Sequence, residues 1–397
     1  MINKNFTLLW WGQFVSQVGN RLYLMALSWY FVAEIGDSKG LFILFIISSL
    51  PSLLFGALVG PLIDRCGKKK ILIGCDTFCG LLTGLLAFLV YNGTATPPVI
   101  YAICFLINSI NLLFSPAVNS MMPLIIENSQ LQRGMSYMKM ITFLGQILGA
   151  AIGGMLVGFL GVYLTILINS ISFLLSAFSE LFITFRESIT RARGNYVDQI
   201  KEGIKYVTDN PLVKRVTIIA VGCNLFIPVI FVYIPLLIKN ELGLGAMEYG
   251  FADAMIPAGS VLIALVIATQ KKQILPLRVL TLGLGGLAVC CFCLSFFSNY
   301  AIILFALFLY GIFVNYININ VITYFVKSID AEFRGRFFSI LESFSYASVS
   351  LSYALATVIQ DFTNVTTALA INSFGLLAFV AVAAVWDNVF NKKTEIG

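Results

Sequence analysis

Apolar runs of about 18 or more residues recur along the whole chain, and they constrain its fold more than any other feature. Each run is long enough to cross a hydrocarbon layer of about 30 Å as a helix, at about 1.5 Å per residue. A segment inside a bilayer must satisfy its backbone hydrogen bonds internally, which favours helices. With 59% hydrophobic and 11% charged residues, the sequence therefore predicts an all-α, polytopic membrane protein.

The runs predict about twelve spans, arranged as two pseudo-symmetric bundles of six helices. The predicted spans are 8–33, 41–63, 71–92, 98–122, 136–160, 162–186, 213–239, 248–270, 277–297, 300–326, 337–360 and 364–390. We expect an N-terminal bundle over residues 1–186, a cytoplasmic connector over 187–212 and a C-terminal bundle over 213–397. Within the connector, apolar residues at helical spacing between Val197 and Val207 predict an amphipathic helix at the membrane face.

The net charge of +6 comes from basic residues in short loops between the spans. Such loops mark the cytoplasmic side, so this charge indicates orientation and not nucleic-acid binding. We expect both termini to be cytoplasmic, the protein to lie in the cell membrane, and the first span to stay in the mature chain, because no signal-peptide pattern precedes it.

Several functional classes lack their signatures. The chain has no histidine, so the cysteines at 290, 291 and 293 are not expected to bind a metal, and serines lack a histidine partner for nucleophilic catalysis. There is no Gly-rich Lys-Ser/Thr loop for ATP phosphates. We therefore expect neither an enzyme nor a bound metal or cofactor.

The two halves share a short pattern before their fifth spans. Arg133-Gly134 is followed by Ser136, and Arg334-Gly335 is followed by Ser339, with an acidic residue upstream in each case. Together with the six-plus-six count, this suggests an internal duplication, which in membrane proteins often marks a transporter whose halves rock around a central site.

Two motifs resemble a known family, the major facilitator superfamily. Gly60-x-x-x-Asp64-Arg65-x-Gly67-Lys68-Lys69 resembles its motif between spans 2 and 3, on the expected side. Gly145-x-x-x-Gly149-Ala150-x-x-Gly153-Gly154 resembles its exporter motif, with Ala150 where proline is usual. The second pattern is also typical of a general helix-packing seam.

Other stretches resemble the branch that holds macrolide-efflux proteins and siderophore exporters, which are drug:proton antiporters. These stretches are Trp11-Gly-Gln-x-Val-Ser-Gln-x-Gly, Ile73-Gly-Cys-Asp76, Ser115-Pro-Ala-x-Asn119 and Glu332-Phe-Arg-Gly-Arg-Phe-Phe-Ser. The chain departs from many relatives at Asn20, Asn108 and Asn169, where charged residues are common. The coupling ion is therefore open, although a proton gradient remains the expectation.

The charged segment around Asp64 suggests a cytoplasmic gate. The Asp64 carboxylate can face the start of the span at 337–360, where free N–H groups favour an anion. A contact made only when the cytoplasmic side is closed would act as a latch. The predicted gate residues are Gly60, Asp64, Arg65, Gly67, Lys68, Lys69, Lys139, Arg334, Arg336 and Glu342. Alternatively, the basic residues only set topology and contact lipid headgroups.

Polar residues inside the spans form a candidate substrate cavity, since each needs a partner or a wet surface. They are Asn20, Arg21, Asn108, Asn111, Asn224, Asn315, Asn318 and Asn320. Alternatively, the asparagines are hydrogen-bonding glue between helices, worth about 1 kcal/mol per contact. Arg21 can bind an anionic group, pair with Glu34 or Asp361 at an outer gate, or extend to the outer surface.

Proton coupling would require a buried acid, because the chain has no histidine. The candidates are Asp76, Glu180 and Asp253, together with the gate acid Glu342. Lys139 and Glu342 occupy matching places in the two halves, three residues after the shared serine.

We therefore expect a monomeric secondary transporter that exports an amphipathic small organic molecule across the lipid bilayer by proton antiport. The expected substrate is macrolide-like or siderophore-like, and neutral, zwitterionic or anionic rather than a lipophilic cation. The alternatives are a lipid or lysolipid flippase, a solute importer of the same fold, and a receptor or assembly factor that transports nothing.

Overall fold

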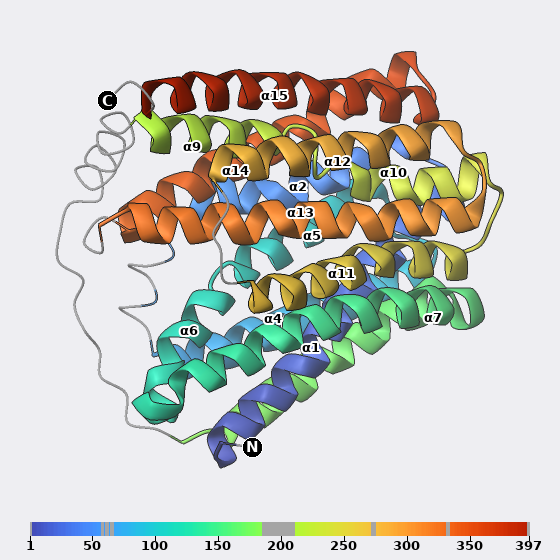
Figure 1. The fold of residues 1–397 in the computed structure, drawn as a ribbon. Coiled ribbons are helices and arrows are strands. Elements are labelled where there is room, and N and C mark those ends of the chain that lie inside the picture. The colour runs from blue at the N-terminus through green and yellow to red at the C-terminus, as the bar shows by residue number, and fades with distance from the viewer. Residues whose placement is uncertain are drawn as a thin grey trace. The chain divides into compact units, whose positions relative to one another are not determined.

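The computed structural model describes residues 2–56, 59, 63, 67–184, 211–270, 275–330 and 334–394, and the regular structure of these residues is helical throughout. The helices of the first half are α1 (Lys4–Trp29), η1 (Tyr30–Ile35), α2 (Ser38–Phe55), α4 (Lys68–Tyr91), α5 (Pro97–Asn111), α6 (Phe114–Ile125), η3 (Asn128–Gln130) and α7 (Leu131–Leu181). Those of the second half are α9 (Pro211–Cys223), α10 (Ile230–Leu236), η4 (Leu237–Glu241), α11 (Ala246–Thr269), α12 (Pro276–Phe296), α13 (Tyr300–Ser328), α14 (Arg334–Phe362) and α15 (Val365–Thr394) (Figure 1).

The predicted all-α membrane fold is confirmed. Within the described ranges, eight helices are long and apolar enough to cross a membrane. Two further long helices, α1 and α14, are less apolar because glutamine, asparagine, serine and charged residues interrupt them. A transmembrane helix can carry such residues where it faces other helices or a wet cavity.

Two predicted spans are not the single continuous helices that were expected. The span predicted at 213–239 is broken between α9 and α10, where Pro228 cannot donate a backbone hydrogen bond. The carbonyls left free are satisfied by side chains: Phe226 O accepts from the Asn372 amide and Ile227 O from the Tyr310 hydroxyl, at 3.1 and 2.8 Å. The span predicted at 98–122 is interrupted between α5 and α6, four residues before the ring of Pro116.

Helix α7 contains both spans predicted on either side of residue 161. The chain bends there because Gly161 adopts a φ of 81°, which a glycine tolerates without a Cβ clash. The predicted amphipathic helix of the connector lies outside the described residues. Pro211 is the first residue of α9, a position that suits its missing N–H.

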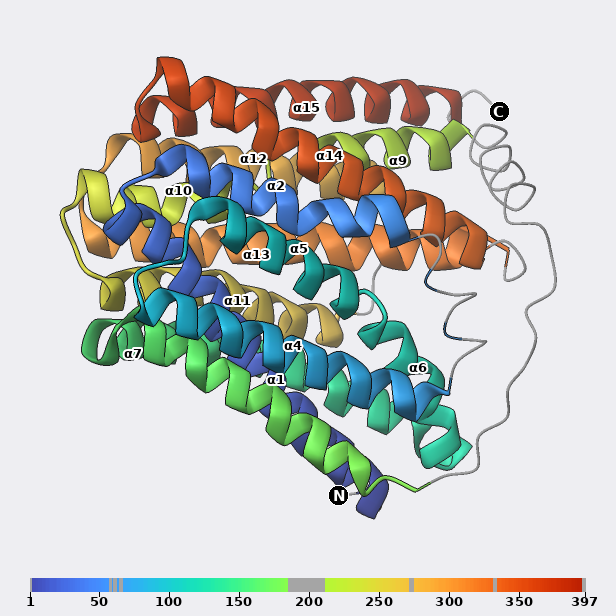
Figure 2. The ribbon, with the colours of Figure 1, turned by 180° about the vertical axis from the view of Figure 1, so that it is seen from behind.

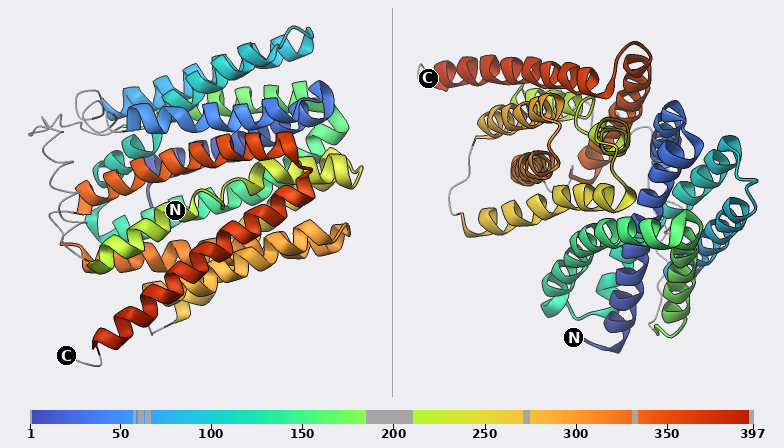
Figure 3. Two further views of the ribbon diagram at one scale, coloured as in Figure 1. Left: turned by 90° about the horizontal axis from the view of Figure 1, so that it is seen from above. Right: turned by 90° about the vertical axis from the view of Figure 1, so that its right-hand side faces the viewer.

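The chain forms two compact units. Unit 1 consists of Met1–Arg193 and Leu244–Ala254, and unit 2 of Gly194–Gly243 and Met255–Gly397. In unit 1, α7 packs along both α1 and α4, and α2 packs on α5 (Figure 2). In unit 2, α12 packs on α13 and α15 (Figure 3).

Small residues bring the helices of unit 1 close together. A Cβ added to Gly149 on α7 would lie 2.6 Å from the Arg21 Cβ and 2.7 Å from the Val18 carbonyl oxygen on α1. Gly145 and Gly153 face the same helix. One residue further, a Cβ on Gly154 would lie 2.7 Å from the Cα of Gly250 at the start of α11. The glycine segment therefore packs α7 against two helices of its own unit.

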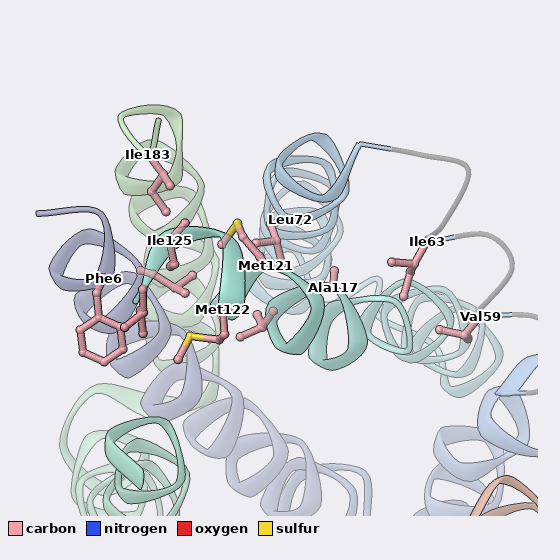
Figure 4. Close-up of a cluster of buried hydrophobic side chains, with 12 residues drawn as sticks. Phe6, Val59, Ile63, Leu72, Ala117, Met121, Met122, Ile125 and Ile183 are labelled. Atoms are coloured by element: carbon pink, nitrogen blue, oxygen red, sulfur yellow. The ribbon is translucent and has the colours of Figure 1, made fainter. Parts of the chain in front are cut away.

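A cluster of buried apolar side chains packs several helices together at one end of unit 1 (Figure 4). Its members come from α1, α4, α6 and the residue after α6, the second residue after α7 and two positions before α4. They are Phe6, Leu9, Val59, Ile63, Leu72, Ala117, Val118, Met121, Met122, Ile125, Ile126 and Ile183. Ile63 directly precedes Asp64 in the sequence and is 2% exposed. Ile63 thus belongs to the core of unit 1.

Candidate functional site: two cavities and the buried charges

Unit 2 contains a cavity of about 270 Å³ that is lined by several of the predicted site residues. Asn224, Asn318, Glu342 and Ser345 supply its polar groups. The remaining lining side chains are apolar and come from α9, α13, α14 and the break after α9: Ala220, Cys223, Ile227, Val314, Ile317, Val321, Ile322, Phe325, Phe338 and Leu341. A mainly apolar wall with a few hydrogen-bonding groups is typical of a site for a small organic molecule.

Unit 1 contains a second cavity, of about 150 Å³. Gln13 and Gln17 of α1, Ser115 and Asn119 of α6, and Lys139 of α7 supply its polar groups. Lys139 and Glu342, which match each other in the internal repeat, therefore each line the cavity of their own unit. The unit 1 cavity thus has a cationic group in its wall, and the unit 2 cavity has an acidic group.

The other predicted cavity asparagines make hydrogen bonds of two kinds. The Asn315 amide donates to the Ser260 carbonyl on α11 at 2.7 Å, and the Asn111 side-chain oxygen lies 3.6 Å from the Cys79 thiol on α4, so these two join helices. Asn108 and Asn320 donate to the carbonyl four residues earlier in their own helices. Asn20 is half-buried on α1.

Arg21 forms an ion pair with Asp253, which is 4% exposed and belongs to the part of α11 in unit 1. From the sequence, Glu34 and Asp361 are the acids considered as partners of Arg21, and Asp253 is placed among the coupling candidates. Nearby, the ring of Tyr249 stacks on Trp29 with centroids 6.0 Å apart, and Gly250 meets Gly154. The start of α11 is therefore fixed to α1 and α7 by an ion pair, a ring contact and a close backbone contact.

The predicted gate residues are only partly described. Gly60, Asp64 and Arg65 lie outside the described residues, as does the side chain of Arg336. Gly67 precedes the first residue of α4, and Lys68 is buried. The Lys69 ammonium donates to the Leu181 carbonyl at the end of α7 at 2.8 Å, where a cation is favoured. The Arg334 guanidinium donates to the Ile329 carbonyl at 2.9 Å.

The coupling candidates divide into two sites. Asp253 pairs with a cation, whereas Asp76 on α4 and Glu180 on α7 are both buried and interact with each other. Across the described part of the chain, no cluster of three metal-binding side chains occurs.

Sequence reasoning missed the polar residues Gln13, Gln17, Ser115 and Asn119 as cavity residues. A signal for them existed, because each pair is spaced four residues apart, on one helix face, within the stretches that resemble the efflux branch. It also missed Tyr249, since only the tertiary structure brings the start of α11 onto α1.

The chain matches the family model described as Major Facilitator Superfamily over residues 9–352 and 216–397. Macrolide efflux protein A of Streptococcus pyogenes is 23% identical to it over 371 residues, which cover 90% of this chain and 89% of that protein. A putative bacilysin exporter, BacE of Bacillus subtilis, is 25% identical over 249 residues, or 62% of this chain and 61% of BacE. The crystal structure of the nucleoside transporter NupG shares the fold with a TM-score of 0.79, at 13% identity over 96% of this chain and 98% of that one.

Proposed function

The chain belongs to the major facilitator superfamily and is a multi-pass membrane transporter, and we propose that it exports an amphipathic small organic molecule in exchange for protons. The main support for this proposal is the cavity of unit 2, where two amides, a carboxylate and a serine hydroxyl are surrounded by apolar side chains. Such a wall matches a molecule with a large apolar surface and a few polar groups. The similarity to macrolide efflux protein A over most of both chains supports export of a macrolide-like compound.

The proposed substrate is neutral, zwitterionic or anionic and not a lipophilic cation. Lys139 at the unit 1 cavity can meet an anionic group, and Glu342 at the unit 2 cavity can meet the cationic group of a zwitterion. Arg21 is compensated by Asp253 within unit 1, so its charge is balanced. Asn224 and Asn318 can each donate and accept a hydrogen bond, which suits hydroxyl, amide and carbonyl groups of a substrate.

We further propose that the protein acts as a monomer in the cell membrane with both termini in the cytoplasm. The distribution of arginine and lysine between the two sets of loops supports this orientation. Alternating access then exposes the cavity to each side in turn, with the segment around Asp64 closing the cytoplasmic side against the start of α14. The burial of Ile63 in the core of unit 1 supports this proposal, as does the packing of Phe337 on Phe325 in unit 2, with ring centroids 4.7 Å apart.

A vesicle assay tests the direction and the coupling of transport. The full-length protein is reconstituted in liposomes with radiolabelled erythronolide B, an uncharged macrolide ring without an amino sugar, and it is expected to move this drug against its gradient when a proton gradient of the proper sign is imposed. Dissipating the gradient with a protonophore should abolish this accumulation. Equal distribution of the drug with and without the gradient would contradict antiport, and movement of lysolipid alone would favour a flippase.

A variant of the cavity tests the assigned site. Asn318→Leu removes an amide from the unit 2 cavity, so it is expected to change the relative transport of erythronolide B and a more polar uncharged analogue by about tenfold, the equivalent of one hydrogen bond. Thr323→Val is the control, because the Thr323 hydroxyl bonds to its own helix and is not among the lining residues. Loss of folded Asn318→Leu protein with Thr323→Val intact would instead favour a packing role.

A further inference from the structure

Two acidic side chains of unit 1 are buried near each other. Asp76 on α4 and Glu180 on α7 are each 1% exposed, and none of their carboxyl oxygens has a hydrogen-bond partner among the described residues. The two carboxyl groups are close enough for their charges to interact. Buried carboxyls without partners are rare in folded proteins, and each one calls for an explanation.

The surroundings of the pair contain polar groups that can hold a proton in place. The Ser176 hydroxyl, one turn before Glu180, is fully buried beside the Asp76 carboxyl without meeting the full geometry of a hydrogen bond. The thiols of Cys75 and Cys79 instead donate to carbonyls of α5, those of Ile110 and Ile107. No cation among the described residues forms a hydrogen bond or a salt bridge with either carboxyl.

These surroundings do not support two negative charges. An ionised carboxylate in a dry interior needs a cation or several donors, and a second like charge beside it raises the cost further. The Arg21–Asp253 pair of the same unit meets this requirement with a cation. Asp76 and Glu180 can meet it only by holding a proton, as coupled carboxyl pairs do.

A route for the proton leads toward the unit 1 cavity. Gln13 lines that cavity, and its side-chain nitrogen is buried without a partner among the described residues. The neighbouring Gly12 packs on α7, where a Cβ would lie 3.0 Å from the Ser176 hydroxyl oxygen. The carboxyl pair therefore lies behind the part of α1 that forms the cavity wall.

We propose that Asp76 and Glu180 share one proton and together form the proton-binding site of this transporter. The proton sits on one carboxyl oxygen and is hydrogen-bonded to the other carboxylate, with the Ser176 hydroxyl as a further donor. It leaves toward the cavity when the conformational change admits water along the Gln13 side of α1. This inference rests on the proposed proton antiport, and it names the groups that would carry it out.

Infrared spectroscopy tests the site without any substrate, because the probe is the proton itself. Purified full-length protein in lipid is titrated between pH 5 and 9, and the C=O stretching band of a protonated, buried carboxylic acid is followed. We expect the wild-type protein to show such a band at neutral pH and to lose it on titration. Asp76→Asn/Glu180→Gln should abolish the band, whereas the exposed control Glu127→Gln should retain it.

The single variants keep the test valid if the double variant fails to fold. In Asp76→Asn and Glu180→Gln one acid remains, and its titration midpoint should move because the like charge beside it is gone. A wild-type protein without the band, a band that survives in the double variant, or single variants with an unchanged midpoint would each overturn the proposal.

A transport measurement separates this inference from the proposed function. If erythronolide B is exported, Asp76→Asn/Glu180→Gln should equilibrate the drug down its gradient but lose at least about tenfold of the accumulation driven by protons, while Glu127→Gln stays coupled. Full proton-driven accumulation by the double variant would overturn the site. If the wild-type protein moves no erythronolide B, the export proposal fails for that substrate, and the infrared band alone decides on the proton site.

Discussion

At the scale of single residues, the buried acids of unit 1 have two kinds of environment. Asp253 lies beside the Arg21 guanidinium, so its negative charge is compensated. Asp76 and Glu180 lie side by side without a cation among the described residues. Because an ion in an apolar interior is costly unless it is paired, the first arrangement suits a fixed structural contact and the second suits proton binding.

Removing one partner of the ion pair should destabilise unit 1. Arg21→Gln leaves the Asp253 carboxylate buried without its cation, which typically costs about 3–5 kcal/mol. The free energy of unfolding is measured in detergent with a denaturant. Lys214→Gln removes an exposed cation and is expected to change that energy by less than about 0.5 kcal/mol.

The double variant separates the pair from its individual members. Arg21→Gln/Asp253→Asn replaces both charges with amides that can bond to each other, so it should recover much of the stability lost in Arg21→Gln. Additive losses in the double variant would mean that the two charges do not stabilise one another.

At the scale of the helices, the glycine segment of α7 decides how closely α1 approaches. Without side chains at positions 145, 149 and 153, the α1 backbone and Cβ atoms pack directly on α7. This close approach increases dispersion contacts, which matter in a membrane because burial from lipid gives little hydrophobic gain. The resemblance to an exporter motif and the packing seam therefore concern the same glycines.

A single methyl group on this face should disrupt the packing. In Gly149→Ala the added Cβ would lie 2.7 Å from the Val18 carbonyl oxygen, so α1 must shift, at a cost of about 1–3 kcal/mol. Gly158→Ala on the same helix meets nothing within 4 Å and should be neutral or slightly stabilising. Thermal unfolding of the two variants measures the difference, and equal unfolding temperatures would contradict a close-packed seam.

At the scale of the whole molecule, transport requires two states of the chain, one open to each side of the membrane. The proposed latch biases this equilibrium toward the cytoplasm-closed state through the Asp64 carboxylate and the first turn of α14. Its strength is bounded by the interaction of a carboxylate with a helix N-terminus, about 0.3–1 kcal/mol at an exposed site. A latch of that size shifts populations without locking the transporter.

Asp64→Asn is expected to raise the cytoplasm-open population about two- to fivefold, because the amide lacks the charge that favours the helix N-terminus. In a variant otherwise free of cysteine, Asn318→Cys reports the opening of the unit 2 cavity through its rate of labelling by a membrane-impermeant thiol reagent added on the cytoplasmic side. Glu127→Gln, another exposed acid, is the control. An unchanged labelling rate in Asp64→Asn would remove the latch.

Sequence reasoning alone identified the all-α membrane fold and the family, because the length and apolarity of a span follow from the thickness of the bilayer and are local properties. It also placed a bend beside Gly161. It did not predict the break at Pro228, since whether a proline kinks or ends a helix depends on the partners available to its free carbonyls. Here Asn372 and Tyr310 supply those partners from helices distant in the sequence.

Which polar residues meet depends on how the helices pack. The eight residues predicted to line the cavity are all polar residues within apolar spans, yet they have different environments. Asn318 lines a cavity, Asn315 joins two helices and Arg21 forms an ion pair with Asp253. Asp76 and Glu180 stand more than a hundred residues apart and share one buried position. The physical reason is that the requirement to satisfy a polar group is local, whereas the identity of its partner depends on the packing of helices that the chain brings together only when it folds.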